Sequence, residues 1–320
     1  MSDTTLLVQM LLGALLGLSV YLPLACGQLS LATPGFYAIG GTVAALLSTR
    51  VPALGGSQSD YPLTSVLLEM GLAALVGGLL ALGIGLLVLR LRGIYLTIAT
   101  IALVEILRVV SLNLPITGGA VGIFAIPQPF RDPTGYALFS LVLLALVCWF
   151  CQRLAISRLG RAMAAIRDDE LAAASQAIGV DRIKLLAFVL SALVAALTGV
   201  VAAHFLNSWN PRLGNFDASI TTLAFVVFGG SRSWLGPVLG GLVLTALPEL
   251  LRPVGDLRLI VFGLVILLGP ALFPQGLITP ERLAWSRAWL AARLSRPLVA
   301  AGVGGEASGP AGPSARGPRR

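Results

Sequence analysis

Long stretches without a charged residue constrain this chain more than any other feature of its sequence. Residues 4–49, between Asp3 and Arg50, contain no charge at all. A helix needs about 20 mostly apolar residues to cross the hydrocarbon of a bilayer, so this run is long enough for two crossings. Further uncharged runs extend over residues 70–89, 133–152, 185–211 and 259–280, and a shorter one over 93–104. The pattern predicts a protein that crosses a membrane many times.

The composition supports this interpretation, because 57% of the residues are hydrophobic and only 11% are charged, whereas a soluble domain carries about 25% charged residues. We predict an all-α polytopic membrane protein, a bundle of about 8–9 transmembrane helices. Residues 218–231 and 233–248 are short uncharged runs on either side of Arg232, so each is a tilted or broken span, and 218–231 either crosses fully or is re-entrant. The N-terminus lacks the basic start of a signal peptide and is expected to stay attached.

The distribution of basic residues predicts the orientation. Loops rich in Lys and Arg stay cytoplasmic, and with segment 153–184 inside, 16 of the 22 basic residues fall on the inner side. Segment 153–184 and the tail 281–320 are then cytoplasmic, with the N-terminus outside. We attribute the net charge of +8 to the membrane topology and to contact with anionic lipid, and not to nucleic-acid binding.

One compact charged stretch, "GRAMAAIRDDELAAASQAIGVDRIKLLAF" at residues 160–188, interrupts the apolar sequence. Residues 160–167 are predicted to form two helical turns, and Asp168, Asp169 and Glu170 offer capping side chains and negative charge for a second helix. An Ala-rich body and a left-handed stop at Gly179 define a helix of about ten residues. It is too short to span the bilayer, and either a partner or the chain's own membrane domain covers its apolar face.

This stretch with the helix after it resembles the cytoplasmic loop of the permeases of branched-chain amino acid ABC importers, of the LivM type. The segments "LRGIYLTIATIALVEILR" (91–108), "FVVFGGSRSWLGPVLGGLVLTALPELLR" (225–252) and "GQLSLATPGFYAIGGTVAALLS" (27–48) resemble the same family. The resemblance implies a permease domain over 1–280, whose segment 153–184 carries one short coupling helix that docks the ATPase. The implied docking residues are Gly160, Arg161, Arg167, Asp168, Asp169, Glu170, Ala173, Ala174 and Gly179.

The same resemblance implies the partners and the location. A second permease of LivH type, two ABC ATPase subunits and a periplasmic substrate-binding protein are expected to assemble with this chain in a bacterial inner membrane. The expected substrates are branched-chain amino acids. A urea or short-amide permease of the same family is the first alternative, and a stand-alone channel or ion-coupled carrier is an alternative from another class.

Several kinds of chemistry are not supported by the sequence. Lys184 is the only lysine, and no phosphate-binding loop surrounds it, so partner subunits are expected to hydrolyse ATP and this chain to bind no cofactor. His204 is the only histidine, which excludes a multi-histidine metal site, and we expect it to pack or to lie at the interface. Cys148 and Cys151 are expected to pack between helices. The chain is interpreted as a transporter subunit, not an enzyme.

Polar side chains inside membrane helices are costly and often line a path. Glu105 and Arg108 are spaced to form an ion pair. The candidate substrate path comprises Gln28, Ser30, Tyr37, Tyr95, Thr97, Thr100 and Glu105, although hydrogen bonding between helices explains each of them equally well. Small-residue stripes, such as Ala73, Gly77, Ala81 and Gly85, predict close packing within the chain. In the tail, residues 282–296 are expected to form an interfacial helix, and the residues after Pro297 to be disordered.

Overall fold

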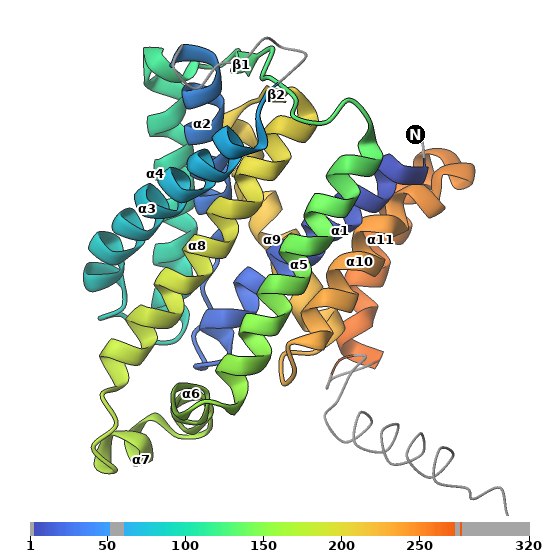
Figure 1. Ribbon diagram of the computed structural model, residues 1–320. Helices are drawn as coiled ribbons and strands as arrows, with labels where there is room; N and C mark the ends of the chain where they lie inside the picture. The colour runs from blue at the N-terminus through green and yellow to red at the C-terminus, as the bar shows by residue number, and fades with distance from the viewer. Residues whose placement is uncertain (1–2, 52–60, 273–275, 277–320) are drawn as a thin grey trace, which may run out of the picture. The chain divides into compact units, whose positions relative to one another are not determined.

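The computed structural model describes residues 3–51, 61–272 and 276, and within these ranges the chain is almost entirely helical (Figure 1). The predicted tail 281–320, with its interfacial helix at 282–296, lies outside the described residues. The helices are α1 Asp3–Leu24, α2 Thr33–Arg50, α3 Leu63–Val88, α4 Ile94–Asn113, α5 Pro133–Ile156, α6 Arg158–Asp168, α7 Glu170–Ser175, α8 Val180–Leu206, α9 Phe216–Gly229, α10 Leu235–Leu250 and α11 Arg258–Leu272. Short 3-10 turns η1 (Pro115–Thr117), η2 (Pro211–Leu213) and η3 (Arg252–Leu257) connect some of them.

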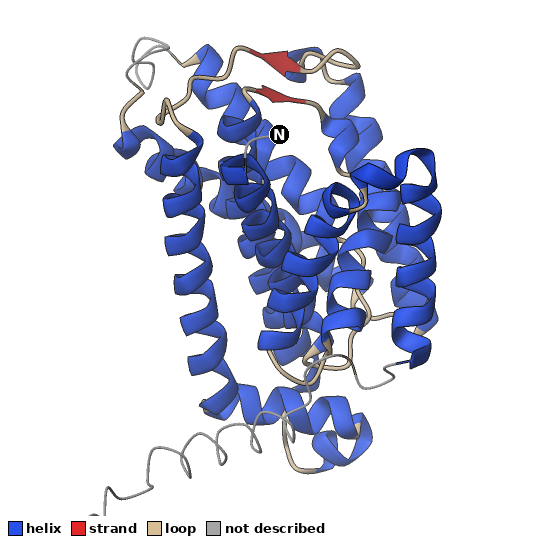
Figure 2. Cartoon of the chain, turned by 90° about the vertical axis from the view of Figure 1, so that its right-hand side faces the viewer, coloured by secondary structure: helices blue, strands red, loops and turns tan. Residues whose placement is uncertain are grey.

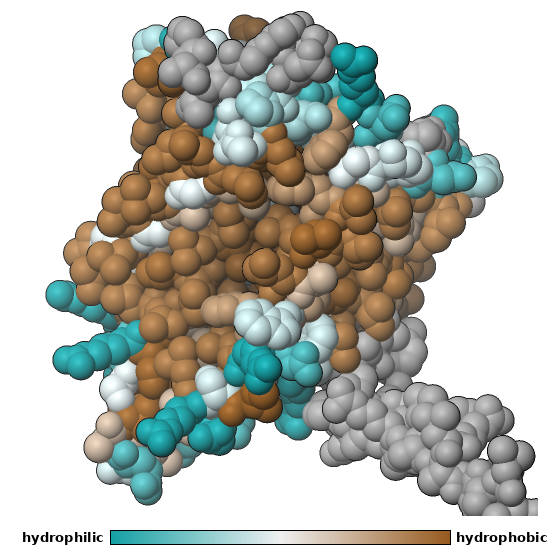
Figure 3. Space-filling model, in the orientation of Figure 1, coloured by the Kyte–Doolittle hydropathy of each residue, from teal (hydrophilic) through white to brown (hydrophobic). Residues whose placement is uncertain are grey.

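The uncharged runs of the sequence become the membrane helices. Five described helices, α1, α3, α4, α5 and α8, are long and apolar enough to cross a membrane, and the run before Arg50 forms two helices as predicted. Helices α9, α10 and the central part of α11 are apolar but shorter. Figure 3 shows a broad apolar band on the face turned toward the viewer, with polar residues gathered above and below the band. The prediction of a polytopic α-helical membrane protein is confirmed at this level.

Small residues allow the helices to approach closely, as the stripes in the sequence predicted. Ala73, Gly77, Ala81 and Gly85 of α3 are all buried, and α3 packs against α8. A Cβ atom at Gly199 of α8 would lie 2.2 Å from the backbone oxygen of Tyr37 in α2. The pairs Gly13/Gly17 and Gly236/Gly240 likewise face backbone or side chains of this chain. These stripes therefore serve packing within the chain.

A small feature that sequence patterning did not predict lies at one end of the helices. Strands β1 (Ile123–Phe124) and β2 (Ser208–Trp209) pair antiparallel, joining the segment before α5 to the segment after α8. Trp209 extends from this ladder into the helices, where its indole N–H donates to the oxygen of Ala38 at 3.1 Å. The all-α prediction is therefore correct except for these four residues. Figure 2 shows the strands at one end and the short helices α6 and α7 at the other.

Two helices begin inside the bundle, not at its ends. Residues 25–32 leave α1 in non-helical conformation before α2 begins at Thr33, and residues 207–215 lie between α8 and α9 with only β2 and η2 as regular structure. Arg232, just after α9, lines the same cavity as Arg167 of α6. Between residues 207 and 232 the chain therefore runs from the end of the bundle that carries β1 and β2 to the end that carries α6. Helix α9 forms only part of that path.

Candidate functional site

Helix α6 lies across the end of the bundle because one of its faces is apolar and the other is basic. The hydroxyl of Ser157 caps it by accepting a hydrogen bond from Gly160 N at 3.1 Å. Met163 and Ile166 are buried, and Met163 packs with Cys26 and Ala187. Arg158 and Arg161 are exposed on the other face. The predicted helix at 160–167 is present, and it is anchored on the membrane helices.

Helix α7 follows after one non-helical residue, and the predicted acidic cap forms. The Asp169 carboxylate accepts hydrogen bonds from Leu171 N at 2.9 Å and from Ala172 N at 3.0 Å, which satisfies two of the free N–H groups at the helix start. The helix has six residues rather than about ten, ending at Ser175. The left-handed residue is Ala177, with φ 59°, whereas Gly179 has φ −74° and caps α8. The predicted stop at Gly179 was therefore wrong.

The nine predicted docking residues do not share one surface. Arg161, Asp168, Asp169, Ala174 and Gly179 are exposed, whereas Gly160, Arg167 and Glu170 are half-buried and Ala173 is buried. Gly160 is close to the end of α5, because a Cβ atom there would lie 2.1 Å from the oxygen of Leu154. Arg167 packs against Gly27. Leu171, which the sequence did not single out, is 75% exposed and is the most exposed large apolar side chain of the described residues.

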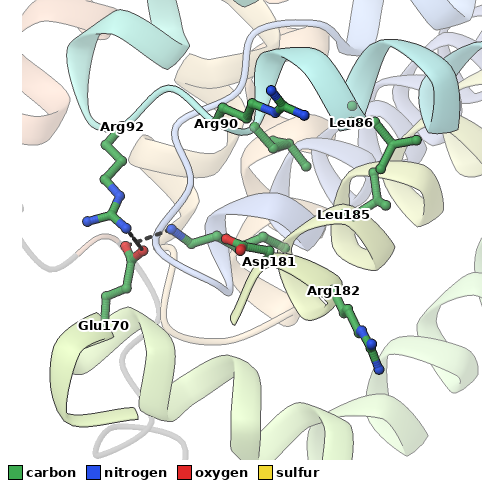
Figure 4. Close-up of a pocket in the computed structure, with 10 residues that line it drawn as sticks. Leu86, Arg90, Arg92, Glu170, Asp181, Arg182 and Leu185 are labelled. Atoms are coloured by element: carbon green, nitrogen blue, oxygen red, sulfur yellow. Dashed lines mark hydrogen bonds and ion pairs between the residues drawn. The ribbon is translucent and has the colours of Figure 1, made fainter. Parts of the chain in front are cut away.

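Glu170 connects α7 to two other parts of the chain. Its Oε2 accepts a 2.6 Å hydrogen bond from Nζ of Lys184 in the first turns of α8, and its Oε1 lies 3.7 Å from an Nη atom of Arg92. Figure 4 shows Glu170 of α7 facing Arg92, which lies in the turn between α3 and α4. A movement of α7 would therefore act directly on α8 and on the turn between α3 and α4.

The break between α1 and α2 passes along α4, so the structure brings several predicted path residues together. Thr97 Oγ1 donates to the oxygen of Leu29 at 3.1 Å, and Thr100 Oγ1 accepts from Leu31 N at 3.1 Å. Ser219 of α9 donates to the oxygen of Leu31 at 3.1 Å. Non-helical backbone at membrane depth needs such internal partners. These hydroxyls supply them, so part of this polar cluster has a structural task.

The remaining predicted path residues lie in different surroundings. Gln28 and Ser30 are buried, and Ser30 Oγ accepts from Ala32 N at 3.4 Å. Tyr37 lies elsewhere, with its ring edge-on to Trp209 at 5.2 Å, and it lines a separate cavity with Thr221. Tyr95 is exposed. The seven residues thus do not form one site, and Gln28, Ser30, Thr97 and Thr100 are the ones that lie along the same break.

The predicted pair of Glu105 and Arg108 is present, and it has a second function. Glu105 Oε2 lies 2.6 Å from an Nη atom of Arg108, with the two side chains 35% and 30% exposed. Its other oxygen accepts from Phe216 N at 3.2 Å, so the carboxylate faces the positive end of α9. Asn215 caps the same helix by accepting from Ala218 N at 2.8 Å.

Comparisons with known proteins assign the chain to a family. The family model described as the permease component of the branched-chain amino acid transport system matches residues 4–269. The high-affinity branched-chain amino acid transport system permease LivM of Escherichia coli K12 is 34% identical, over 87% of this chain and 69% of that protein. The chain belongs to the branched-chain amino acid permease family.

Two further relatives are also transport permeases. The LivH permease of the same Escherichia coli system is 39% identical over 28% of the present chain and 28% of that protein. The ribose import permease RbsC of Escherichia coli K12 is 27% identical over 82% of each chain. No solved structure matches this permease.

One buried cluster of this permease was missed by the sequence analysis. Glu69 of α3 and His204 of α8 are both fully buried, with Nε2 of His204 2.6 Å from Oε2 of Glu69. Tyr61 donates a short hydrogen bond to the same carboxylate, and burial and this bond raise the pKa of Tyr61 above its ordinary value. His204 Nδ1 lies 2.7 Å from the oxygen of Pro127. The expected packing role of His204 is thus correct, but its partner was not foreseen, because Glu69 is 135 residues away in the sequence.

The described part of this permease holds no group of three histidine, cysteine, aspartate or glutamate side chains placed to bind a metal ion. Cys26, Cys148 and Cys151 are free thiols. Cys151 is buried in the main apolar cluster, and Cys148 packs against that cluster. Helix packing accounts for both cysteines of the C-x-x-C sequence.

Proposed function

We propose that this permease is a membrane subunit of an ATP-driven importer that carries branched-chain amino acids delivered by a periplasmic binding protein. The observation that carries the proposal is the match of the family model to residues 4–269 together with the 34% identity to LivM over most of both chains. The short helix α7, which is linked by ion pairs to α8 and to the turn between α3 and α4, is the feature through which a motor subunit would act.

The proposed topology has nine crossings, formed by α1–α5 and α8–α11. Helix α9 has 14 residues, or about 21 Å, so the segment before it completes that crossing. The end of the bundle with α6 and α7 is cytoplasmic, since Arg90, Arg92, Arg153, Arg158, Arg161, Arg167, Arg182, Lys184 and Arg232 are on the loops and helix ends there. The tail 281–320 would leave on the same side, and the membrane would be the bacterial inner membrane.

A second permease of LivH type is the proposed neighbour at α4. Glu105 and Arg108 lie inside this apolar helix, in its second half, and keep about a third of their side chains exposed. Charged groups at that depth face protein or a water-filled path and not lipid. The partner would therefore cover this surface, and the substrate would pass along it. ATP would be bound and hydrolysed by two ATPase subunits, with no cofactor held by this chain.

Uptake in cells tests the proposal. We expect a strain that lacks only this gene to lose uptake of labelled leucine, isoleucine and valine, and the intact gene to restore it. Unchanged uptake with the other subunits present would contradict the substrate assignment. Loss of urea or ribose uptake in place of leucine uptake would assign the permease to one of those substrates instead.

A further inference from the structure

A cavity of about 540 Å³ lies where the α1–α2 break, the start of α4 and the α7–α8 segment meet. Ligand pockets in proteins have volumes of roughly 300–1,000 Å³, so it is large enough for a small metabolite. Its wall includes Arg92, Glu170 and Lys184, together with the aliphatic side chains of Leu29, Leu91, Ile94 and Leu96. Both signs of charge therefore border one apolar space.

Gln28 in the wall of this cavity is in an unusual state. Its side chain is 3% exposed, and neither Nε2 nor Oε1 has a hydrogen-bond partner among the described residues. A buried donor or acceptor without a partner costs about 1–3 kcal/mol, and this amide strands an NH2 group with two donors as well as an acceptor oxygen. A side chain in this state gains free energy from any rearrangement that brings it a polar ligand.

The positions of the charged groups at the cavity suit a zwitterion. Lys184 holds one oxygen of Glu170 at 2.6 Å, whereas Arg92 lies 3.7 Å from the other oxygen and is mostly exposed. Lys184 and Oε2 of Glu170 neutralise each other, while the loose pair can separate at little cost and so free Oε1 of the same carboxylate. A guest ammonium would then face Glu170, and its carboxylate would face Arg92, which binds carboxylates in bidentate fashion.

We propose that this cavity is a release site for an aliphatic α-amino acid at the cytoplasmic end of the permease. The zwitterionic head lies between Arg92 and Glu170 and bonds the amide of Gln28, and the aliphatic side chain contacts Leu29 and Ile94. Because Glu170 belongs to α7, displacement of α7 removes the partner of the ammonium and weakens binding. This assignment rests on the proposed function and deepens it, since it gives α7, the helix through which the ATPase would act, a direct contact with the substrate.

Binding of tritiated leucine to the assembled permease and ATPase complex in nanodiscs, without the binding protein, tests the site. We expect saturable binding that unlabelled leucine displaces. Neither 4-methylpentanoate nor 3-methylbutylamine should displace it, since each lacks one charge of the head. Gln28→Leu and Arg92→Gln should each weaken binding by about tenfold or more, the effect of losing a hydrogen bond to a charged group. Arg90→Gln is the matched control, because Arg90 lines only the adjacent cavity.

Stability separates a ligand contact from a structural role. Gln28→Leu removes a stranded amide and keeps a similar volume, so the variant should melt at or above the wild-type temperature while losing leucine binding. Absence of saturable binding to the wild-type complex, wild-type affinity in either variant, or equal competition by the single-charge analogues would overturn the site. Transport of leucine by the complete importer, measured in parallel in proteoliposomes, reports on the proposed function independently: if transport persists while the binding test fails, only the release site is wrong.

Discussion

Glu69 and His204 are 135 residues apart in sequence, yet their side chains meet at 2.6 Å in the interior of the protein. The contact joins α3 to α8, and the hydroxyl of Tyr61 and the oxygen of Pro127 complete it. Since a carbonyl oxygen only accepts, His204 Nδ1 carries a proton and donates to Pro127. The cluster connects three separate parts of the chain: α3 with the residues just before it, the segment around Pro127, and α8.

Removing one partner of this pair should be costly. We expect His204→Leu to lower the free energy of unfolding by about 3–5 kcal/mol, because it leaves the buried Glu69 carboxylate without its main partner. Adding Glu69→Leu should recover part of the loss, since no charge is then stranded. Thermal melting of the detergent-solubilised protein measures both. Glu249→Gln, in an exposed pair with Arg252, is the control and should change little. Simple addition of the two single losses would contradict the coupling.

Glu105 and Arg108 should behave as a coupled pair with a smaller effect. Glu105→Gln leaves Arg108 unpaired within a membrane helix, so less folded protein is expected. Both side chains are partly exposed, so the loss in the free energy of unfolding should be smaller than that for a fully buried pair, which is about 3–5 kcal/mol. Arg108→Gln in the same chain should restore part of it. The amount of monodisperse protein after extraction is the readout. Additive losses would show that the two side chains act independently.

The exposed face of α7 should be where an ATPase subunit docks. We expect Leu171→Arg and Ala174→Arg to reduce ATPase co-purification by about tenfold or more, because each places a charge at the centre of an apolar contact. Val121→Arg, at an exposed position on the loop before β1, is the matched control. Ala173 is unsuitable for this test, since its side chain is buried and arginine there would disturb folding. Full recovery of ATPase with both variants would exclude α7 as the docking site.

The contact of α2 with α8 should tolerate no added atom. At Gly199 a Cβ would lie 2.2 Å from the oxygen of Tyr37 and 2.8 Å from Gly41 N, so Gly199→Ala should cost about 1–3 kcal/mol through overpacking. Gly83 of α3 has no atom within 4 Å of the same position. Gly83→Ala should therefore be neutral or stabilising by about 0.5–1 kcal/mol. The melting temperature should fall for Gly199→Ala and stay unchanged or rise for Gly83→Ala, and equal shifts would contradict the packing.

The turn after α7 should respond to substitution at Ala177 and not at Gly179. Ala177 adopts φ 59°, which costs a residue with a Cβ roughly 1–2 kcal/mol, so Ala177→Gly should stabilise the protein by about 1 kcal/mol. Gly179 has an ordinary negative φ, and the nearest atom to a Cβ there is 3.9 Å away. Gly179→Val should then leave the melting temperature nearly unchanged. A large loss at Gly179 would contradict the observed backbone.

The parts of the fold that depend on local patterns could be predicted from the sequence. Uncharged runs gave the long helices, because hydrocarbon admits few charges, and Asp169 was recognisable as a cap from the residues after it. The predicted length of α7 was wrong because the sequence favours the glycine, Gly179, as the left-handed stop, whereas in the folded chain Ala177 adopts that conformation despite its Cβ. Leu31 could not be placed, since its backbone depends on Thr100 and Ser219, which are distant in sequence. Glu69 was missed for the same reason.

The β1–β2 ladder has a mechanical consequence. Backbone hydrogen bonds and the Trp209 side chain fasten the helices at one end, whereas α6 and α7 are connected at the other end through side chains. A force on α7 would then pivot α8 about its fastened end, with the 27-residue helix acting as a lever. A tilt of about 10° over the roughly 33 Å from Leu206 to Lys184 moves the lysine by about 6 Å. That displacement exceeds the length of the ion pair with Glu170, so a small rotation at the ladder is enough to exchange the partners of Lys184 at the far end.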